Sequence, residues 1–333
     1  MVVPVYNAAD VIERCLDSVL AQTLDGVEVI CVDDESSDDS LEILRRYERE
    51  HPGQVRVLTQ TNQGQGATRN RGMDVARGTY LAFLDNDDYL DPDFLERCYR
   101  QLEDTGADVV CCGYRRVEPD GRVLQERLPV DGPFFPYSLV APWSKVYRRA
   151  LVADNQITFP AIVFGEDSVF TVRVLDATDK VTVVACAGYV WLNTPTSTSN
   201  VLMTGLDNVR EPVRELLTLL TQVPGRSPSY EYYYIKNAIF LLLHLGRVDP
   251  AEVFVRHHRE LMAQVADTVR HPLRRAVFGP RGDTWTIRTI VAVYMLVHRA
   301  HLTGLFARVY AWLGPGRRPG FQHLRGADRR RAS

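Results

Sequence analysis

The strongest single signal in the sequence is the segment Tyr80-Leu81-Ala82-Phe83-Leu84-Asp85-Asn86-Asp87-Asp88. It begins with an apolar run typical of a buried strand, and three carboxylates follow within four positions. Like charges packed this closely are unfavourable unless a cation neutralises them. Because carboxylate oxygens suit Mg²⁺ or Mn²⁺, the stretch predicts a divalent-metal site formed by Asp85, Asp87 and Asp88. The alternative is an acidic turn that caps a helix beginning at Asp91-Pro92.

Short β-rich runs and helical patterns alternate around this stretch, over residues 1–113. Leu41, Leu44 and Tyr47, for example, recur at the spacing of an amphipathic helix. Strands that alternate with helices form βαβ units, so we predict an α/β fold of Rossmann-like type, with a mostly parallel sheet and flanking helices. The expected strands are Val2–Tyr6, Val27–Val32, Val55–Gln60, Tyr80–Leu84 and Asp108–Cys112.

The pattern changes after residue 113. Glu118-Pro119-Asp120-Gly121 predicts a hairpin turn. From about residue 203 onward the sequence reads as helix, and it ends in an arginine-rich tail. We therefore expect an α/β domain over residues 1–200 and a helical accessory region over 201–333. Within the first domain, the later segments predict helices over 146–153 and 166–177 and strands over 181–185 and 188–192.

Composition excludes several classes of protein. The 333 residues are 45% hydrophobic and 24% charged, unlike a disordered chain, a collagen or a disulfide scaffold. Six cysteines without a CxxC pair lie in apolar segments, so we expect reduced core thiols in a cytoplasmic protein. No secretory signal follows Met1, and no apolar run is long enough to predict a membrane-spanning helix.

The formal net charge of -3 conceals a split between the two halves. Residues 1–200 carry 19 Lys and Arg against 32 Asp and Glu, a net of -13, whereas residues 201–333 carry 20 against 10, a net of +10. Such an asymmetry indicates two regions with different partners.

Further polar residues follow the expected strands, where ligands bind in parallel α/β sheets. Asp34 lies in a second acidic cluster and is placed to accept a hydrogen bond from a base or a ribose, whereas Ser36, Asp38 and Asp39 are expected to cap the next helix. Arg69 follows a glycine-containing loop, Asn62-Gln63-Gly64, and either contacts a phosphate or is simply solvated.

Read together, these segments resemble the family 2 glycosyltransferases of the GT-A fold. The resemblance is collinear over residues 1–195. It rests on Pro4-Val5-Tyr6-Asn7, Ser18–Thr23, Val32-Asp33-Asp34, Asn62-Gln63-Gly64, Ala67–Gly72, Gly78–Asp88, Pro142–Tyr147 and Gly165-Glu166-Asp167.

The resemblance implies inverting transfer of a sugar from a nucleotide-diphosphate donor, with a UDP-sugar favoured, to a hydroxyl of a cell-surface polysaccharide, glycolipid or other glycoconjugate. Asp167 corresponds to the general base, and Glu166 orients it or the acceptor. Asp85, Asp87 and Asp88 correspond to the residues that hold Mg²⁺ or Mn²⁺. The implied nucleotide-sugar contacts are Pro4, Tyr6, Asn7, Asp34, Asn62, Gly64, Arg69, Asp85 and Lys145.

Lys145 is also singled out by composition, because lysine is rare in this chain, which has three lysines against 36 arginines. It is expected to present a compact charge to the diphosphate or the acceptor; the alternative is a surface lysine that opens a helix.

Two other classes of function stay open. A metal-dependent nucleotidyltransferase would also use carboxylates at strand ends, although the Glu166-Asp167 pair counts against it. A catalytically silent nucleotide-sugar-binding protein is suggested by the short first strand and by residues 192–199, which carry no cation.

The basic half carries less defined signals. His257, His258, His298 and His301 lack the further ligands that a zinc site needs. The apolar and basic segment 287–313 predicts either a helical cap on the first domain or an interfacial helix that holds the protein at the inner face of an anionic membrane. No nucleic-acid-binding module is recognisable.

Overall fold

The structure is a computed structural model, and it describes residues 1–130, 132–162, 164–193, 210–223, 227–245 and 250–312. The chain forms two compact units, residues 1–230 and 231–333. The expected domain boundary at residue 200 and the arginine-rich tail lie outside the described residues.

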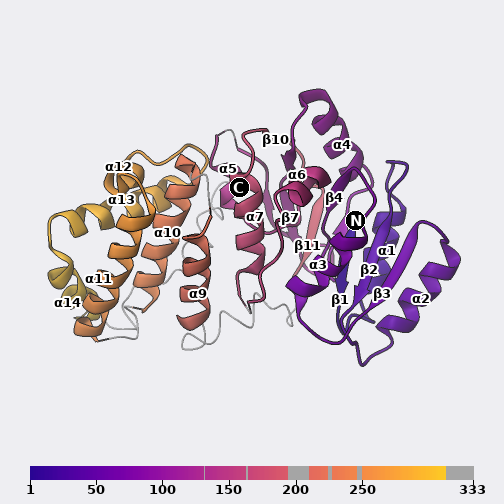
Figure 1. The fold of residues 1–333 in the computed structure, drawn as a ribbon, viewed down its shortest axis with the longest axis horizontal. Coiled ribbons are helices and arrows are strands. Elements are labelled where there is room, and N and C mark those ends of the chain that lie inside the picture. The colour runs from indigo at the N-terminus through magenta and orange to yellow at the C-terminus, as the bar shows by residue number, and fades with distance from the viewer. Residues whose placement is uncertain (131, 163, 194–209, 224–226, 246–249, 313–333) are drawn as a thin grey trace. The chain divides into compact units, whose positions relative to one another are not determined.

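The first unit begins with three parallel strands linked by helices, as the alternating pattern predicts. Strands β1 (Val2–Val5), β2 (Val29–Asp33) and β3 (Val55–Thr59) pair in that order, with Pro4 opposite Val32 and Asp33 opposite Thr59. Figure 1 shows the three strands side by side, with helix α2 next to β3. The helices in this part are α1 (Ile12–Leu20), α2 (Ser40–Glu50) and α3 (Gln65–Val75).

Strand β4 (Tyr80–Ala82) continues the sheet on the other side of β1. Val2 forms a parallel bridge with Phe83, and its carbonyl accepts a hydrogen bond from the Leu84 amide at 3.1 Å. Beyond β4 the order is β9 (Lys145–Arg148), β6 (Val109–Cys111) and β10 (Val181–Val183). Strand β9 is antiparallel to both of its neighbours, whereas β6 and β10 are parallel to each other.

The helix expected over residues 146–153 is therefore wrong in its first part. Val146 and Tyr147 belong to β9, and helix α6 covers Arg149–Asp154. Both residues have high strand propensity, and their backbones pair with β4 on one side and β6 on the other. This pairing with two strands outweighs the helical spacing of the apolar residues.

A smaller sheet lies beside the main one, with the order β5-β11-β7-β8. Its strands β7 (Tyr114–Val117) and β8 (Val123–Arg127) form the hairpin expected at residues 118–121, and β11 (Tyr189–Leu192) pairs with β7 and with β5 (Tyr89–Leu90). The expected helix over 166–177 is confirmed as α7 (Glu166–Asp176), against which α9 (Arg210–Leu220) packs. The remaining helices of this unit are α4 (Phe94–Thr105) and α5 (Phe135–Ser138).

The core of the first unit is apolar and contains all six cysteines. Every one of these thiols is buried and free, as the sequence predicts. Gly72 on α3 is packed so closely against β1 that an added Cβ would meet Val2 Cγ1 at 2.4 Å. Close packing of this kind fixes α3, and the residues it carries, against the sheet.

The second unit is helical. It contains most of α10 (Pro228–Leu245), then α11 (Ala251–Thr268), α12 (Pro272–Val277), α13 (Trp285–Arg299) and α14 (Thr303–Trp312), orange to yellow in Figure 1. Glu231 is fully buried and accepts hydrogen bonds from the Arg270 amide and the Arg275 guanidinium. Among the described helices, none combines the length and the apolar character needed to cross a bilayer.

Candidate functional site

Asp34 lies at the carboxyl end of β2 and holds the loop that follows β3. Its Oδ1 accepts hydrogen bonds from Gln60 Nε2 at 2.8 Å and from the Gln63 amide at 3.0 Å, and its Oδ2 accepts one from the Gly64 amide at 2.9 Å. The side chain is buried. Asp34 therefore shapes the loop, and an incoming base would meet a carboxylate whose position is already fixed.

The loop itself turns sharply into helix α3. Gly64 has φ +85°, a conformation that glycine adopts without strain, and it is the residue before the first helical turn. The Asn62 amide donates to Glu35 Oε2 at 3.1 Å, so both ends of the loop are held by the acidic segment after β2. The expected contacts Asn62 and Gly64 thus lie beside Asp34.

The carboxyl end of β1 lies next to this loop. Tyr6 is half exposed, and Asn7 adopts φ +47° while its Oδ1 accepts a hydrogen bond from the Ser37 amide at 2.8 Å. The Pro4 carbonyl accepts a hydrogen bond from Asn86 Nδ2 at 3.1 Å. This contact joins the end of β1 to the acidic stretch after β4, as expected for neighbouring parallel strands.

Arg69 links the two acidic motifs of the site. Its Nη2 donates to Asp85 Oδ1 at 2.7 Å, and its Nη1 donates to Glu166 Oε1 at 3.4 Å. The guanidinium is 2% exposed, lies 5.3 Å from the centre of the Phe159 ring, and leaves Nε without a hydrogen-bond partner in the described residues. The solvated arginine considered from the sequence is therefore wrong, because Arg69 is a buried bridge between carboxylates.

Asp85 and Asp87 follow β4, and of the two it is Asp85 that contacts Arg69. Asp85 also accepts a hydrogen bond from Gln65 Nε2 at 3.3 Å. Burial, together with the charge of Asp85, raises the pKa of Asp87 to about 6. A divalent cation would relieve this repulsion, so the residues present fit an Mg²⁺ or Mn²⁺ ion held by two carboxylates, with other ligands from water and phosphate.

Asp88 makes a different set of hydrogen bonds from these two side chains. Its Oδ2 accepts a hydrogen bond from the Tyr189 hydroxyl at 2.5 Å, and its Oδ1 accepts one from the Leu192 amide at 2.9 Å. The carboxylate is buried, and desolvation together with Asp87 and Asp85 raises its pKa well above the usual range. Asp88 thus ties the acidic stretch to β11, and its expected share in metal binding stays a prediction. No group of three or more His, Cys, Asp or Glu side chains with metal-binding geometry occurs in the described residues.

The Glu166-Asp167 pair begins helix α7 and faces Arg69. Asp167 Oδ1 accepts hydrogen bonds from the Ser168 amide at 2.6 Å and the Ser168 hydroxyl at 3.3 Å. Burial raises the pKa of Asp167, and burial with the charge of Asp167 raises the pKa of Glu166 to about 6. The structure thus brings the expected base and its neighbour to the same buried arginine as Asp85.

Lys145 differs from the expectation that it presents a charge to a diphosphate. It lies in β9 rather than at a helix start, it is 1% exposed, and its Nζ donates to the carbonyls of Leu139 and Ala141, the latter at 2.8 Å. Burial lowers its pKa to about 8. Lys145 satisfies backbone carbonyls inside the protein, so the expected surface position at the start of a helix is wrong. Its expected contact with a diphosphate or acceptor stays a prediction.

Three residues near the site were not predicted from the sequence. Gln65 and Asn86 make the contacts described above. Tyr189 accepts a hydrogen bond from the Asp85 amide at 3.4 Å while donating to Asp88, and its ring stacks on Trp143 at 4.5 Å between centres. The sequence placed Tyr189 on the expected strand 188–192. It gave no indication of the contact with Asp88, because the two residues are 101 positions apart.

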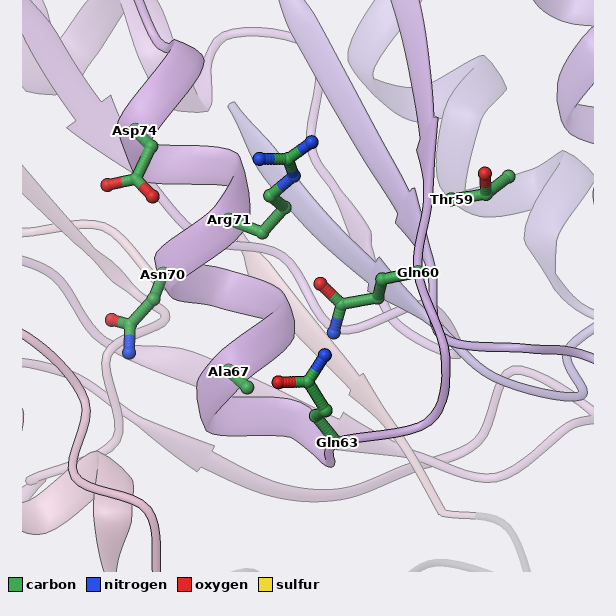
Figure 2. Close-up of a pocket in the computed structure, with 7 residues that line it drawn as sticks. All are labelled: Thr59, Gln60, Gln63, Ala67, Asn70, Arg71 and Asp74. Atoms are coloured by element: carbon green, nitrogen blue, oxygen red, sulfur yellow. The ribbon is translucent and has the colours of Figure 1, made fainter.

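A hollow of about 390 Å³ lies between α3 and the end of β3 (Figure 2). Figure 2 shows Gln60 and Gln63 extending toward each other from the loop, with Arg71 on the adjacent face of α3. The hollow borders the Asp34 loop, but none of the carboxylates named above lines it. Its lining residues are Thr59, Gln60, Gln63, Ala67, Asn70, Arg71 and Asp74.

Comparison with known proteins relates the chain to glycosyltransferases. Residues 1–160 match the model of Glycosyl transferase family 2. The chain is 34% identical over 200 residues to the poly(ribitol-phosphate) beta-glucosyltransferase of Bacillus spizizenii, a match that covers 58% of this chain and 32% of that protein. The chain spans less than two thirds of the length of the curated relatives that it matches.

Two solved structures share the fold. TarS 1–349 of S. aureus in complex with UDP-GlcNAc superposes with a TM-score of 0.59 at 20% identity, over 89% of this chain and 90% of that chain. The mannosyltransferase PcManGT of Pyrobaculum calidifontis in complex with GDP-Man and Mn²⁺ has a TM-score of 0.52 at 17% identity, over 94% and 85% of the two chains. The chain thus matches the model of Glycosyl transferase family 2 over residues 1–160 and shares its fold with these two glycosyltransferase structures.

Proposed function

We propose that this protein is an inverting glycosyltransferase that moves a sugar from a UDP-sugar to a hydroxyl of a polysaccharide or related glycoconjugate. The observation that carries the proposal is the buried Arg69, which joins Asp85, after β4, to Glu166, at the start of α7. This contact brings the residues suited to a donor diphosphate next to the pair suited to an acceptor hydroxyl.

The donor side is assigned to the ends of β1, β2 and β4. Asp34, held by three hydrogen bonds, offers a fixed acceptor for a base, and the exposed ring of Tyr6 offers an apolar face beside it. Asp85 and Asp87 would hold the divalent ion. When bound, such an ion stabilises the negative charge that builds on the departing diphosphate.

The acceptor side is assigned to Asp167. Because both contacts from Ser168 go to Oδ1, we assign Oδ2 to the acceptor. The acceptor oxygen attacks the anomeric carbon, its proton passes to Oδ2, and the bond from that carbon to the phosphate oxygen breaks as the nucleoside diphosphate leaves. The raised pKa of Asp167 makes it a stronger base than an exposed carboxylate.

Three observations support the proposed substrates, the divalent metal and the compartment. TarS was solved with UDP and UDP-GlcNAc, and a curated relative is named for a poly(ribitol-phosphate) acceptor. PcManGT was solved with Mn²⁺. Six buried free thiols support a reducing, cytoplasmic compartment.

A donor panel tests the proposal. Purified full-length chain is incubated with UDP- and GDP-sugars and Mg²⁺ or Mn²⁺, and nucleoside diphosphate release is measured with a mixture of polysaccharide acceptors. We expect one donor to be turned over, EDTA to abolish turnover, and Asp167→Asn to reduce it by about 10²–10⁴-fold while donor binding persists. Absence of binding to every nucleotide-sugar, or full activity of Asp167→Asn, would contradict the assignment. Asp74→Asn, at an exposed position on the outer side of α3, is the matched control and should keep the activity of the parent.

A further inference from the structure

The last two helices that the structure describes in the second unit, α13 and α14, have an unusual distribution of apolar residues. Each has a buried side, with Val291, Tyr294 and Met295 on α13 and Ala307 on α14. Each also has an exposed apolar side, and we call these residues together the apolar stripe. The apolar stripe consists of Trp285 (79% exposed), Val293 (52%) and Leu296 (51%) on α13, Leu302 (48%) at the start of α14, and Leu305 (61%) and Val309 (49%) on α14.

The spacing of these residues places them on one exposed face of each helix rather than scattering them around it. At about 100° per residue, positions 285, 293 and 296 fall within a quarter turn of α13, and 302, 305 and 309 do the same on α14. A helix that only packs on a core needs one apolar side. Packing on the core therefore does not explain the second apolar side, which is suited to binding a partner.

The charged side chains on α13 and α14 themselves are all arginines: Arg288, Arg299 and Arg308. Residues 272–312 contain six arginines and a single acidic residue, Asp283. Asp283 is itself paired with Lys236 at 3.1 Å. Arg299 and Arg308 are exposed on α13 and α14, next to the apolar residues.

These observations select the class of partner. A second copy of this chain, meeting it through the same surface, would bring arginine against arginine. A polyanion such as a nucleic acid would use the arginines but leave the leucines and Trp285 in water. An anionic bilayer accounts for both the apolar residues and the arginines. The apolar side chains insert among the acyl chains, and the arginines contact the lipid phosphates.

We infer that the apolar stripe of α13 and α14 binds the surface of an anionic lipid bilayer, with both helices lying along the interface. Trp285 suits this place, because indole rings gather at the boundary between acyl chains and headgroups. The inference is independent of the transfer chemistry, and its test involves no nucleotide.

Vesicle sedimentation with the full chain is the first test. We expect the protein to pellet with phosphatidylcholine vesicles that contain phosphatidylglycerol, and to bind pure phosphatidylcholine at least about tenfold more weakly, with binding to the anionic vesicles falling as salt is raised. The double variant Leu296→Ser with Leu305→Ser should bind the anionic vesicles at least about tenfold more weakly. Val123→Ser with Leu124→Ser, at exposed apolar positions of β8 in the other unit, is the matched control and should bind like the parent.

Tryptophan fluorescence gives a second readout that folding defects would not mimic. The emission of the parent should shift to the blue when anionic vesicles are added, and Trp285→Phe, which keeps an apolar ring, should still bind but lose most of the shift. Failure to bind anionic vesicles, or equal binding by the Leu296/Leu305 variant, overturns the inference. A dimer seen by light scattering that the same variant dissociates, without vesicle binding, assigns the apolar stripe to a second copy instead.

Discussion

Arg69 Nη2 lies 2.7 Å from Asp85 Oδ1, and the same guanidinium reaches Glu166 at 3.4 Å. The donor and acceptor sides of the proposed site therefore share one buried cation. A planar guanidinium can hold two carboxylates at once, whereas an ammonium group is a single compact charge.

Arg69→Lys is therefore expected to behave as a disruptive substitution. Loss of one side of a buried ion pair costs about 3–5 kcal/mol in the free energy of unfolding. Urea denaturation and donor titration should show both lower stability and weaker donor binding. Arg71→Lys, two residues along α3 on its exposed side, is the control; equal effects of the two substitutions would refute a special role for Arg69.

Activity is expected to fall in acid. Asp167 must be deprotonated to accept a proton, and burial raises its pKa above the usual range of an aspartate. The pKa of its neighbour Glu166 is raised to about 6. Because the folded-state pKa of Asp167 is raised, kcat/KM should decline with falling pH at a higher pH than an ordinary Asp would give. A profile that stays flat down to pH 4.5, with the protein still folded, would exclude Asp167 as the base.

Lys145→Met should affect stability rather than donor recognition. The substitution leaves the carbonyls of Leu139 and Ala141 without their buried donor, at a cost of about 1–3 kcal/mol in the free energy of unfolding. Donor KM should change little in protein that remains folded. A large rise in KM with unchanged stability would instead restore Lys145 to the diphosphate. Lys180→Met, at an exposed lysine of the same unit, is the matched control.

The second unit should lose stability in mild acid. His258 is buried, its Nδ1 lies 2.9 Å from the Tyr294 hydroxyl, and its Nε2 lies 3.1 Å from His298 Nδ1. Burial, followed by the charges of His298 and Arg259, lowers the pKa of His258 to about 4.

The unfolded chain therefore binds a proton at His258 between pH 6.5 and about 4, where the folded chain does not. The resulting stability is present above pH 6.5 and is lost as the pH falls toward 4, by up to about 3 kcal/mol. Urea unfolding of the parent and of His258→Gln at pH 7 and pH 4.5 measures how much stability each protein loses in acid. Equal pH dependence in both proteins would contradict the prediction, and His257→Gln is the control.

Local patterns in the sequence were sufficient to predict the parallel sheet, the 118–121 hairpin and α7. They also placed Asp34, Asp85 and Asp167 at the ends of the right elements. Each of these features depends on spacing within a few residues, or on the rule that carboxyl ends of parallel strands meet at one edge.

The features that could not be predicted depend on partners far along the chain. Val146 and Tyr147 are strand because β4 and β6 lie on either side of them. Lys145 is buried because carbonyls of the preceding loop fold over it, and Asp88 turns inward because Tyr189, 101 residues later, meets it. From the sequence, Asp88 was expected to bind a ligand because of its charge, and Lys145 because lysine is rare in this chain. Only the fold shows that both charged groups form hydrogen bonds inside the protein.

The placement of β9 between β4 and β6 has a consequence for how the protein is made. As the chain leaves the ribosome, β4 and β6 are both complete before residue 145 exists, so each presents an open strand edge through the synthesis of the intervening residues. Open edges are where nascent chains pair wrongly. Asp85 and Asp87, which follow β4, acquire their final surroundings only after β9 has closed the sheet.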